Sequence, residues 1–146
     1  MHYTEYDTRL AAYAVILDEY DRVLLALWNE AREPLWTLPG GGIELNETVE
    51  EGLKREVHEE TGYDIEPGDV LGVNTHVFGV MDRSVDTERA LKAVRIIYRA
   101  TIIGGELTHE VDGSTDEARW IPLADVPDLP RVELVDVGLG LRTAAV

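Results

Sequence analysis

The chain contains no cysteine. A disulfide framework, a zinc site built on cysteines and a thiol nucleophile are therefore all excluded. Long hydrophobic runs are also missing: the apolar segment from Leu10 to Leu17 is too short to span a membrane, and acidic residues follow it directly. We interpret this segment as a strand and not as a signal sequence, and we expect a soluble, cytoplasmic protein.

Basic residues are scarce. The chain has 13 lysines and arginines against 29 aspartates and glutamates, which gives a formal net charge of −16. Nucleic-acid polymers and anionic membranes are polyanions that favour basic surfaces, so we exclude both classes as partners. A small phosphorylated ligand is compatible with this charge, because it can arrive with a divalent ion already attached. The length of 146 residues predicts a single domain, residues 1–146.

Glutamate is concentrated in one segment, Gly41 to Tyr63. Its sequence, GGIELNETVEEGLKREVHEETGY, holds seven glutamates and two basic residues. Glu56, Glu59 and Glu60 are spaced as i, i+3 and i+4, so on a helix their carboxylates project from one face. Such a face suits Mg²⁺, which takes oxygen ligands and is commonly held by a few carboxylates together with substrate phosphates. The alternative interpretation is a solvated acidic face, which is the usual meaning of clustered charge.

Local patterns predict the helix itself at residues 48–61. Thr48 followed by Glu51 forms a capping box, and Gly62 suits the left-handed position after the last turn. One apolar residue recurs every fourth position to form a stripe that can pack on a core: Val49, Leu53 and Val57.

The whole segment resembles the Nudix box, the motif of the Nudix hydrolases. The match covers the fixed positions of the motif, which here hold Gly41, Glu47, Arg55, Glu56, Glu59, Glu60 and Gly62, and two apolar positions, Val57 and Tyr63. Residues 36–44, WTLPGGGIE, and residues 116–123, DEARWIPL, resemble the segments that flank the box in this family. The resemblance therefore spans roughly residues 8–130. It implies an α/β (α+β) chain with the Nudix fold, an α/β/α sandwich with a mixed β-sheet.

The resemblance also implies a metal site. Glu56, Glu59 and Glu60 match the family's metal ligands, and the loop before the helix, at Gly40, presents a carbonyl oxygen to the metal. Magnesium is the expected ion, with manganese as a substitute.

Four positions of the box are expected to be structural. Gly41 and Gly62 shape the backbone. Arg55 points toward the start of the helix, where it can pair with Glu47 and hold the preceding loop.

The base that deprotonates the attacking water is not settled by the pattern. A carboxylate within hydrogen-bond reach is required. Glu56 is favoured and Glu117 comes next, while Glu60, Glu106 and Glu110 stay open as alternatives. The expected catalytic residues are therefore Glu56, Glu59, Glu60 and Glu117. No substrate-binding residue is assigned, although five side chains are candidates for contact: Arg9, Trp28, Arg32, Arg95 and Arg99.

The expected reaction is metal-dependent hydrolysis of a phosphoanhydride bond in a nucleoside diphosphate linked to another moiety. We expect a nucleoside triphosphate or a related nucleotide, as in MutT-like members. The region around Phe78 and Gly79 lacks the proline that ADP-ribose-cleaving members often carry, and the neighbours of Val80 lack the tyrosine of dinucleoside-polyphosphate members. The alternative is a non-catalytic Nudix-like domain that senses a nucleotide or sugar phosphate. Family members are often dimers, so a homodimer is one option.

Propensity and turn patterns predict the remaining elements. Strands are expected at residues 10–17, 22–28, 42–44, 70–81, 93–103 and 119–121, the first two as a hairpin. Loops are expected at residues 29–34, 82–89 and 104–115. An interruption of regular secondary structure is expected at Glu66 to Asp69, and a final helix at residues 131–143.

Overall fold

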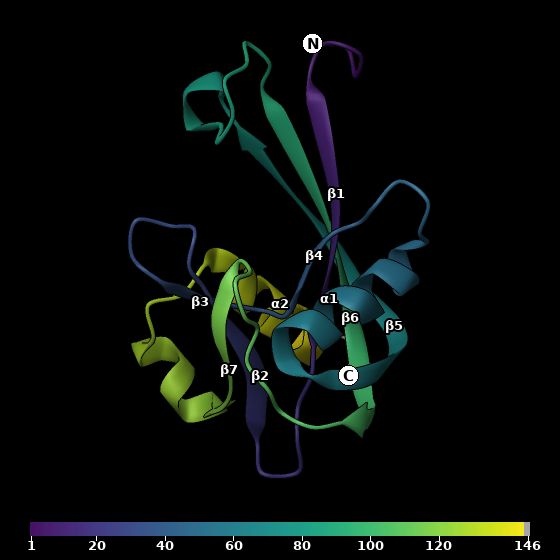
Figure 1. Ribbon diagram of the computed structural model, residues 1–146, viewed down its shortest axis with the longest axis vertical. Helices are drawn as coiled ribbons and strands as arrows, with labels where there is room; N and C mark the ends of the chain where they lie inside the picture. The colour runs from purple at the N-terminus through teal and green to yellow at the C-terminus, as the bar shows by residue number, and fades with distance from the viewer. Residues whose placement is uncertain (145–146) are drawn as a thin grey trace.

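A computed structural model describes residues 1–144 of the chain, and within them the strands form two sheets (Figure 1). The larger sheet is mixed, with the order β4-β1-β6-β5. Its strands are β1 (Asp7–Val15), β4 (Gly40–Gly42), β5 (Tyr63–Phe78) and β6 (Leu91–Gly105). β1 runs parallel to β6, and the other pairs are antiparallel. The smaller sheet is antiparallel, with the order β3-β2-β7, and consists of β2 (Arg22–Trp28), β3 (Leu35–Thr37) and β7 (Thr115–Pro122).

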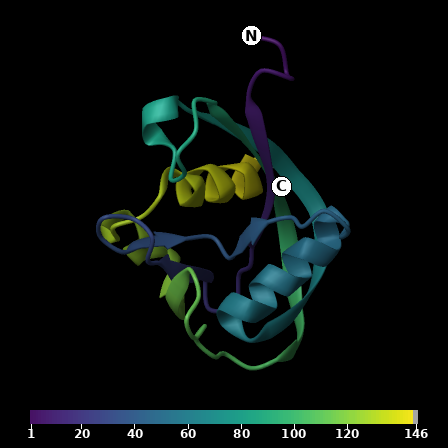
Figure 2. The same ribbon diagram turned by 45° about the horizontal axis from the view of Figure 1, so that its top comes forward.

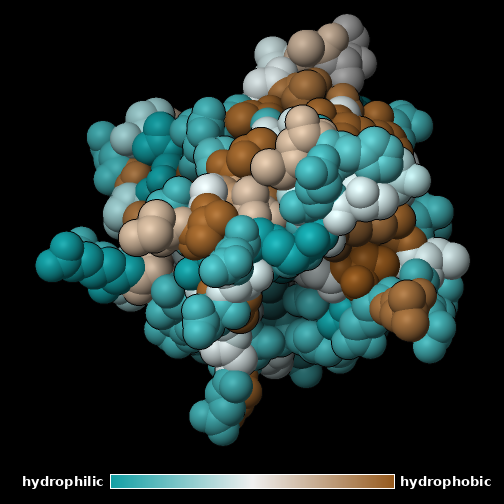
Figure 3. Space-filling model, turned by 90° about the horizontal axis from the view of Figure 1, so that it is seen from above, coloured by the Kyte–Doolittle hydropathy of each residue, from teal (hydrophilic) through white to brown (hydrophobic). Residues whose placement is uncertain are grey.

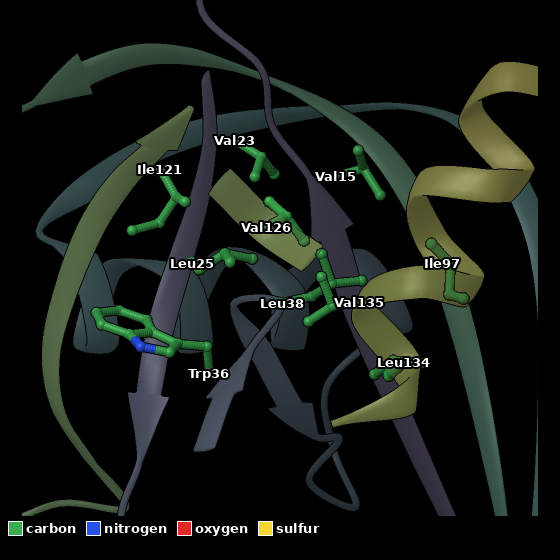
Figure 4. Close-up of a cluster of buried hydrophobic side chains, with 10 residues drawn as sticks. All are labelled: Val15, Val23, Leu25, Trp36, Leu38, Ile97, Ile121, Val126, Leu134 and Val135. Carbon is green, nitrogen blue, oxygen red and sulfur yellow. The ribbon is translucent and has the colours of Figure 1, made fainter. Parts of the chain in front are cut away.

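Helices α1 (Val49–Thr61) and α2 (Glu133–Ala144) cover opposite faces of the mixed sheet (Figure 2). Successive side chains of a strand point to opposite faces. β6 accordingly gives Tyr98 to the buried cluster that contains α1 residues, and Ile97 to the cluster that contains α2 residues. The second of these clusters also joins the two sheets, because Leu25 of β2 and Val15 of β1 both belong to it (Figure 4). The expected α/β/α sandwich with a mixed sheet is confirmed.

Helix α1 begins and ends where its local signals predict. Thr48 is the N-cap, and both hydrogen bonds of the capping box with Glu51 are present. Gly62 follows the helix with a φ of 81°, in the left-handed region that glycine adopts without strain. Leu53 and Val57 are fully buried. The apolar stripe therefore fixes which face of the helix is left for the glutamates.

The prediction that residues 10–17 and 22–28 form a β-hairpin is wrong, except at the turn that connects them. β1 and β2 lie in different sheets, and a single bridge joins Leu17 to Val23. β1 pairs along its length with β6 instead. Its residues 11–12 and 14–15 are all buried, so both faces of the strand are covered, as suits an inner strand between β4 and β6.

The predicted interruption of secondary structure at Glu66 to Asp69 is also wrong, because strand β5 continues through these residues. Register shifts against β6 absorb the irregularity between Pro67 and Val70. β5 is an edge strand, where proline and bulges are tolerated. The strand predicted at residues 70–81 ends earlier, at Phe78, and is followed by the 3₁₀ helix η1 (Val80–Asp82).

Other boundaries differ by a few residues. The short strand expected at residues 42–44 lies at 40–42, whereas β3 and the 3₁₀ helix η2 (Leu123–Asp128) were not predicted. The strands expected at 93–103 and 119–121 and the final helix are confirmed as parts of β6, β7 and α2.

The three long strands β1, β5 and β6 reach past the smaller sheet, toward the N-terminus (Figure 1). There Asp7 accepts hydrogen bonds from Arg89 Nε at 2.7 Å and from Arg83 Nη1 at 3.1 Å. Both arginines hold the pKa of the Asp7 carboxyl below its usual range. These contacts fasten the loop of residues 79–90 to the start of β1.

The surface seen from this end mixes hydrophilic and hydrophobic residues (Figure 3). Met1, Tyr3 and Met81 are among the large apolar side chains that are exposed. As for membrane insertion, residues 1–144 hold no helix that is both long and apolar enough to cross a bilayer.

Candidate active site

The carboxylates of α1 lie directly against the backbone of β4. The Gly40 N–H donates a hydrogen bond of 3.2 Å to Glu60 Oε2. A Cβ atom added to Gly41 would lie 2.7 Å from the Glu56 carboxyl carbon. Glycine at position 41 therefore lets Glu56 approach the strand more closely than any side chain would allow.

The three predicted metal ligands form a series from buried to exposed. Glu60 is 3% exposed. The side chains of Glu56 and Glu59 are 18% and 47% exposed. The site therefore has a closed floor at Glu60 and opens to solvent at Glu59.

Burial and mutual repulsion shape the acid–base behaviour of this cluster. Burial raises the pKa of Glu60 well above its usual value, opposed by the hydrogen bond from Gly40 and reinforced by the charges of Glu56, Glu110 and Glu59. Burial also raises the pKa of Glu56, although Arg55 opposes this effect. The ionised forms of these two carboxylates are disfavoured, and a bound cation would stabilise them.

Arg55 connects α1 to the loop that precedes it. Its Nε and Nη2 atoms donate to the two oxygens of Glu47 at 3.1 and 2.6 Å, and Nη2 also donates to the Gly42 carbonyl at 3.1 Å. The expected contact between Arg55 and Glu47 is thus present, with a bidentate geometry. These bonds, together with one from the Glu44 N–H, lower the pKa of Glu47 to about 2. Arg55 also donates to Glu56 at 2.9 Å.

A fourth carboxylate reaches the cluster from the loop of residues 106–114. Glu110 Oε1 accepts hydrogen bonds from the N–H and the hydroxyl of Thr115, at 3.0 and 2.8 Å. Its negative charge acts on both Glu56 and Glu60. Its loop is tied to the end of α1, because the Thr108 N–H donates to the Thr61 carbonyl at 2.9 Å. This hydrogen bond holds the loop of Glu110 against the end of the helix that carries the predicted ligands.

Glu117 and Glu106, the two other candidates for the base outside α1, differ from Glu110 in their surroundings. Glu117 on β7 accepts a hydrogen bond of 2.9 Å from Arg119, and its side chain is 28% exposed. Glu106 is exposed at the start of the loop. Glu110 is among the main causes of the raised pKa values of Glu56 and Glu60, whereas Glu117 and Glu106 are not among those main causes.

The chemistry of this donor set fits a hard divalent cation. Glu60 is a buried carboxylate with one backbone hydrogen bond, and its neighbours Glu56, Glu59 and Glu110 are also carboxylates. Within residues 1–144 no three such groups already converge on one point. Mg²⁺ commonly keeps several waters and uses one or two carboxylates with substrate phosphates, so it does not require a preformed cage. Glu56, Glu59 and Glu60 are the residues that would hold it.

The Nudix domain family model matches residues 7–137, nearly the whole chain. The chain belongs to the Nudix family. Its Nudix box begins in β4, includes α1 and ends at the first residue of β5.

Relatives and structures agree on the family and differ in substrate. The chain is 36% identical over 119 residues to the human 8-oxo-dGDP phosphatase NUDT18, a match that covers 78% of this chain and 32% of that protein. It is 30% identical over 118 residues to the ADP-ribose pyrophosphatase of Methanocaldococcus jannaschii, with 80% and 62% covered. A Nudix hydrolase from Nitrosomonas europaea has the same fold, with a TM-score of 0.79 at 19% identity and 95% and 90% covered. The chain spans about a third of the length of the first of these relatives.

The sequence did not single out Glu110 among the glutamates of its loop. Its position depends on Thr115, five residues later, and on packing against Gly113. A glutamate followed by glycine and threonine is common in loops, so this pattern alone is not specific for a site. The tie between Thr108 and Thr61 is a long-range contact with no local pattern.

Proposed function

We propose that this Nudix chain hydrolyses a phosphoanhydride bond in a nucleoside diphosphate linked to another moiety, with a nucleoside triphosphate or a related nucleotide as substrate. One observation carries the proposal: Glu60 is a nearly fully buried carboxylate that lies among further carboxylates and receives one backbone hydrogen bond. Such an arrangement costs free energy unless a cation completes it. The acidic helix face is therefore explained by metal binding and not by solvation.

Magnesium is the proposed ion, with manganese as a substitute, because the available donors are all oxygen atoms. A divalent ion at this site supplies charge neutralisation for the diphosphate and activation of a water molecule. Gly40, whose N–H is already bonded to Glu60, keeps its carbonyl as a further proposed ligand. We also propose a cytoplasmic location and a small phosphorylated substrate.

The reaction is tested by a hydrolysis screen with and without Mg²⁺, over nucleoside triphosphates, nucleotide sugars, ADP-ribose and dinucleoside polyphosphates. We expect Mg²⁺-dependent turnover of at least one nucleotide. Glu59→Gln should lower kcat more than about 100-fold, because the loss of partners that only orient metal ligands already costs about 10- to 100-fold.

Glu50→Gln is the matched control for this screen. It makes the same substitution in the first turn of α1, at an exposed residue. Equal activity of the Glu59→Gln and Glu50→Gln variants would contradict the assignment of Glu59. Nucleotide binding without any turnover would instead support a sensor domain.

We further propose that Glu110, in place of Glu117, positions or deprotonates the attacking water. Glu110→Gln is expected to lower kcat by about 100-fold or more, as is typical for a lost general base. Glu117→Gln should change kcat less than about threefold, since Glu117 is paired with Arg119. Glutamine at position 110 can still accept from Thr115, so the loop should keep its conformation.

The measurement is kcat as a function of pH for both variants, with the Mg²⁺ affinity determined in parallel. An unchanged metal affinity, together with loss of the acidic limb of the profile, where protonation of the base slows the reaction, assigns Glu110 as the base. A larger loss of kcat in Glu117→Gln than in Glu110→Gln would refute the proposal.

A further inference from the structure

Side chains of opposite charge lie against the two faces of the glycine strand β4. On the face toward α1, Gly41 contacts the carboxylate of Glu56. On the other face, a Cβ atom added to Gly42 would lie 3.3 Å from Nη2 of Arg9 and 3.6 Å from its Cζ and Nε. The Arg9 guanidinium therefore packs directly against Gly42.

The register of the mixed sheet places Arg9 there. Gly42 pairs with Ala11 of β1, and Arg9 lies two residues before Ala11, on the same face of the strand. Consecutive Cα atoms are about 3.8 Å apart. Glu56 and Arg9 therefore contact β4 one residue apart, on opposite faces of a strand that has no side chains of its own.

Within residues 1–144, Arg9 makes no ion pair and no side-chain hydrogen bond. Six other arginines each contact a carboxylate: Arg22, Arg55, Arg83, Arg89, Arg119 and Arg131. Arg95, on the same face as Arg9, donates to Asn74 at 3.3 Å, toward β5 and away from β4. In a chain with 29 acidic residues, an exposed guanidinium without a carboxylate beside the site is available for an anionic ligand.

We propose that Arg9 binds a phosphate of the substrate that lies beyond the two phosphates joined by the scissile bond. The inference rests on the proposed function, which places the scissile diphosphate at Glu56, Glu59 and Glu60. A nucleoside diphosphate has both of its phosphates at that position. A triphosphate has one more, and Gly42 itself places no side chain between the helix side of β4 and Arg9. Guanidinium groups bind phosphate with two parallel hydrogen bonds, so Arg9 makes the site selective for nucleoside triphosphates over diphosphates.

The first test compares kcat/KM for a nucleoside triphosphate and the diphosphate of the same nucleoside. Arg9→Gln is expected to lower kcat/KM for the triphosphate about tenfold or more, and for the diphosphate less than twofold. Arg9→Lys keeps the charge but loses the planar fork of the guanidinium. Its kcat/KM for the triphosphate should lie between the values for wild type and Arg9→Gln. Arg22→Gln is the control, because it removes the same charge from the first residue of β2, in the smaller sheet.

The second test measures binding and does not need turnover. Calorimetry with non-hydrolysable, methylene-bridged triphosphate and diphosphate analogues in Mg²⁺ should show the same selective loss in Arg9→Gln. Gly42→Ala leaves the charge unchanged but places a methyl group against the guanidinium, and should shift the ratio of the two affinities in the same direction.

The outcomes separate this inference from the proposed function. Equal losses for both nucleotides, no loss, or a loss confined to the diphosphate would each overturn the role of Arg9. If the wild-type protein hydrolysed none of the screened nucleotides, the proposed function would fail, while the ratio of analogue affinities would still test Arg9.

Discussion

Glu60→Gln is expected to lower kcat for a nucleotide substrate more than about 100-fold and, at the same time, to raise the melting temperature of the metal-free protein. Glu60 is 3% exposed, and an amide is far cheaper to bury than an ionised carboxylate. The amide oxygen can still accept the hydrogen bond from Gly40. Loss of activity with gain of stability is the result expected when a buried charge serves a metal and not the fold.

The gain should depend on pH in a defined direction. Because the pKa of Glu60 is raised in the folded state, ionisation of Glu60 destabilises the fold increasingly as pH rises above the unfolded-state value of about 4.5. The melting temperatures of wild type and Glu60→Gln should therefore be close at acidic pH and diverge at neutral pH. A variant that melts lower than wild type at neutral pH, without metal, would show that the carboxylate stabilises the fold.

Gly40→Ala is expected to destabilise the protein by about 2–4 kcal/mol and to reduce activity. Gly40 has a φ of +145°, which residues with a side chain rarely adopt. A Cβ atom at this position would overlap the Ala12 carbonyl oxygen of the paired strand β1. Backbone atoms cannot move aside as a flexible side chain can, so β4 would have to part from β1 and withdraw the Gly40 N–H from Glu60.

The matched control for this substitution is Gly140→Ala in α2. Apart from its chain neighbours and the backbone of its own helix, no atom of residues 1–144 lies within 4 Å of a Cβ added to Gly140, and alanine is favoured over glycine within a helix by about 1 kcal/mol. Chemical denaturation of both variants should therefore give free energies of unfolding that change with opposite signs. A stable, active Gly40→Ala variant would contradict the requirement for glycine in β4.

The sequence predicted the part of the site that depends on local contacts. The capping box at Thr48, the terminal Gly62 and the spacing of the glutamates all act within a few residues of each other, and α1 forms where they indicate. The pair formed by Arg55 and Glu47 is similarly close in sequence, at a separation of eight residues.

What escaped prediction depends on contacts between distant residues. The turn at residues 18–21 favours a hairpin, yet β1 gains more by pairing with β6, about 80 residues later, than with its neighbour in sequence. Pro67 and Gly68 are typical of a break, but the edge position of β5 accommodates them as a bulge. The places of Glu110 and Arg9 follow from a loop contact and a strand register that no local pattern encodes.

The bond between Thr108 and Thr61 has a consequence for how this site can evolve. It joins the loop that carries Glu110 to the helix end that carries Glu60, so these two acidic groups share one rigid support. The loop of residues 79–90 belongs to neither part of that support, whereas Asn29, at the start of the loop of residues 29–34, donates hydrogen bonds to the Gly113 and Ser114 carbonyls of the Glu110 loop. Mutations that alter ligand preference can therefore accumulate in the loop of residues 79–90 and at the start of β1 without disturbing the hydrolytic groups, and new preferences can arise while the reaction stays the same.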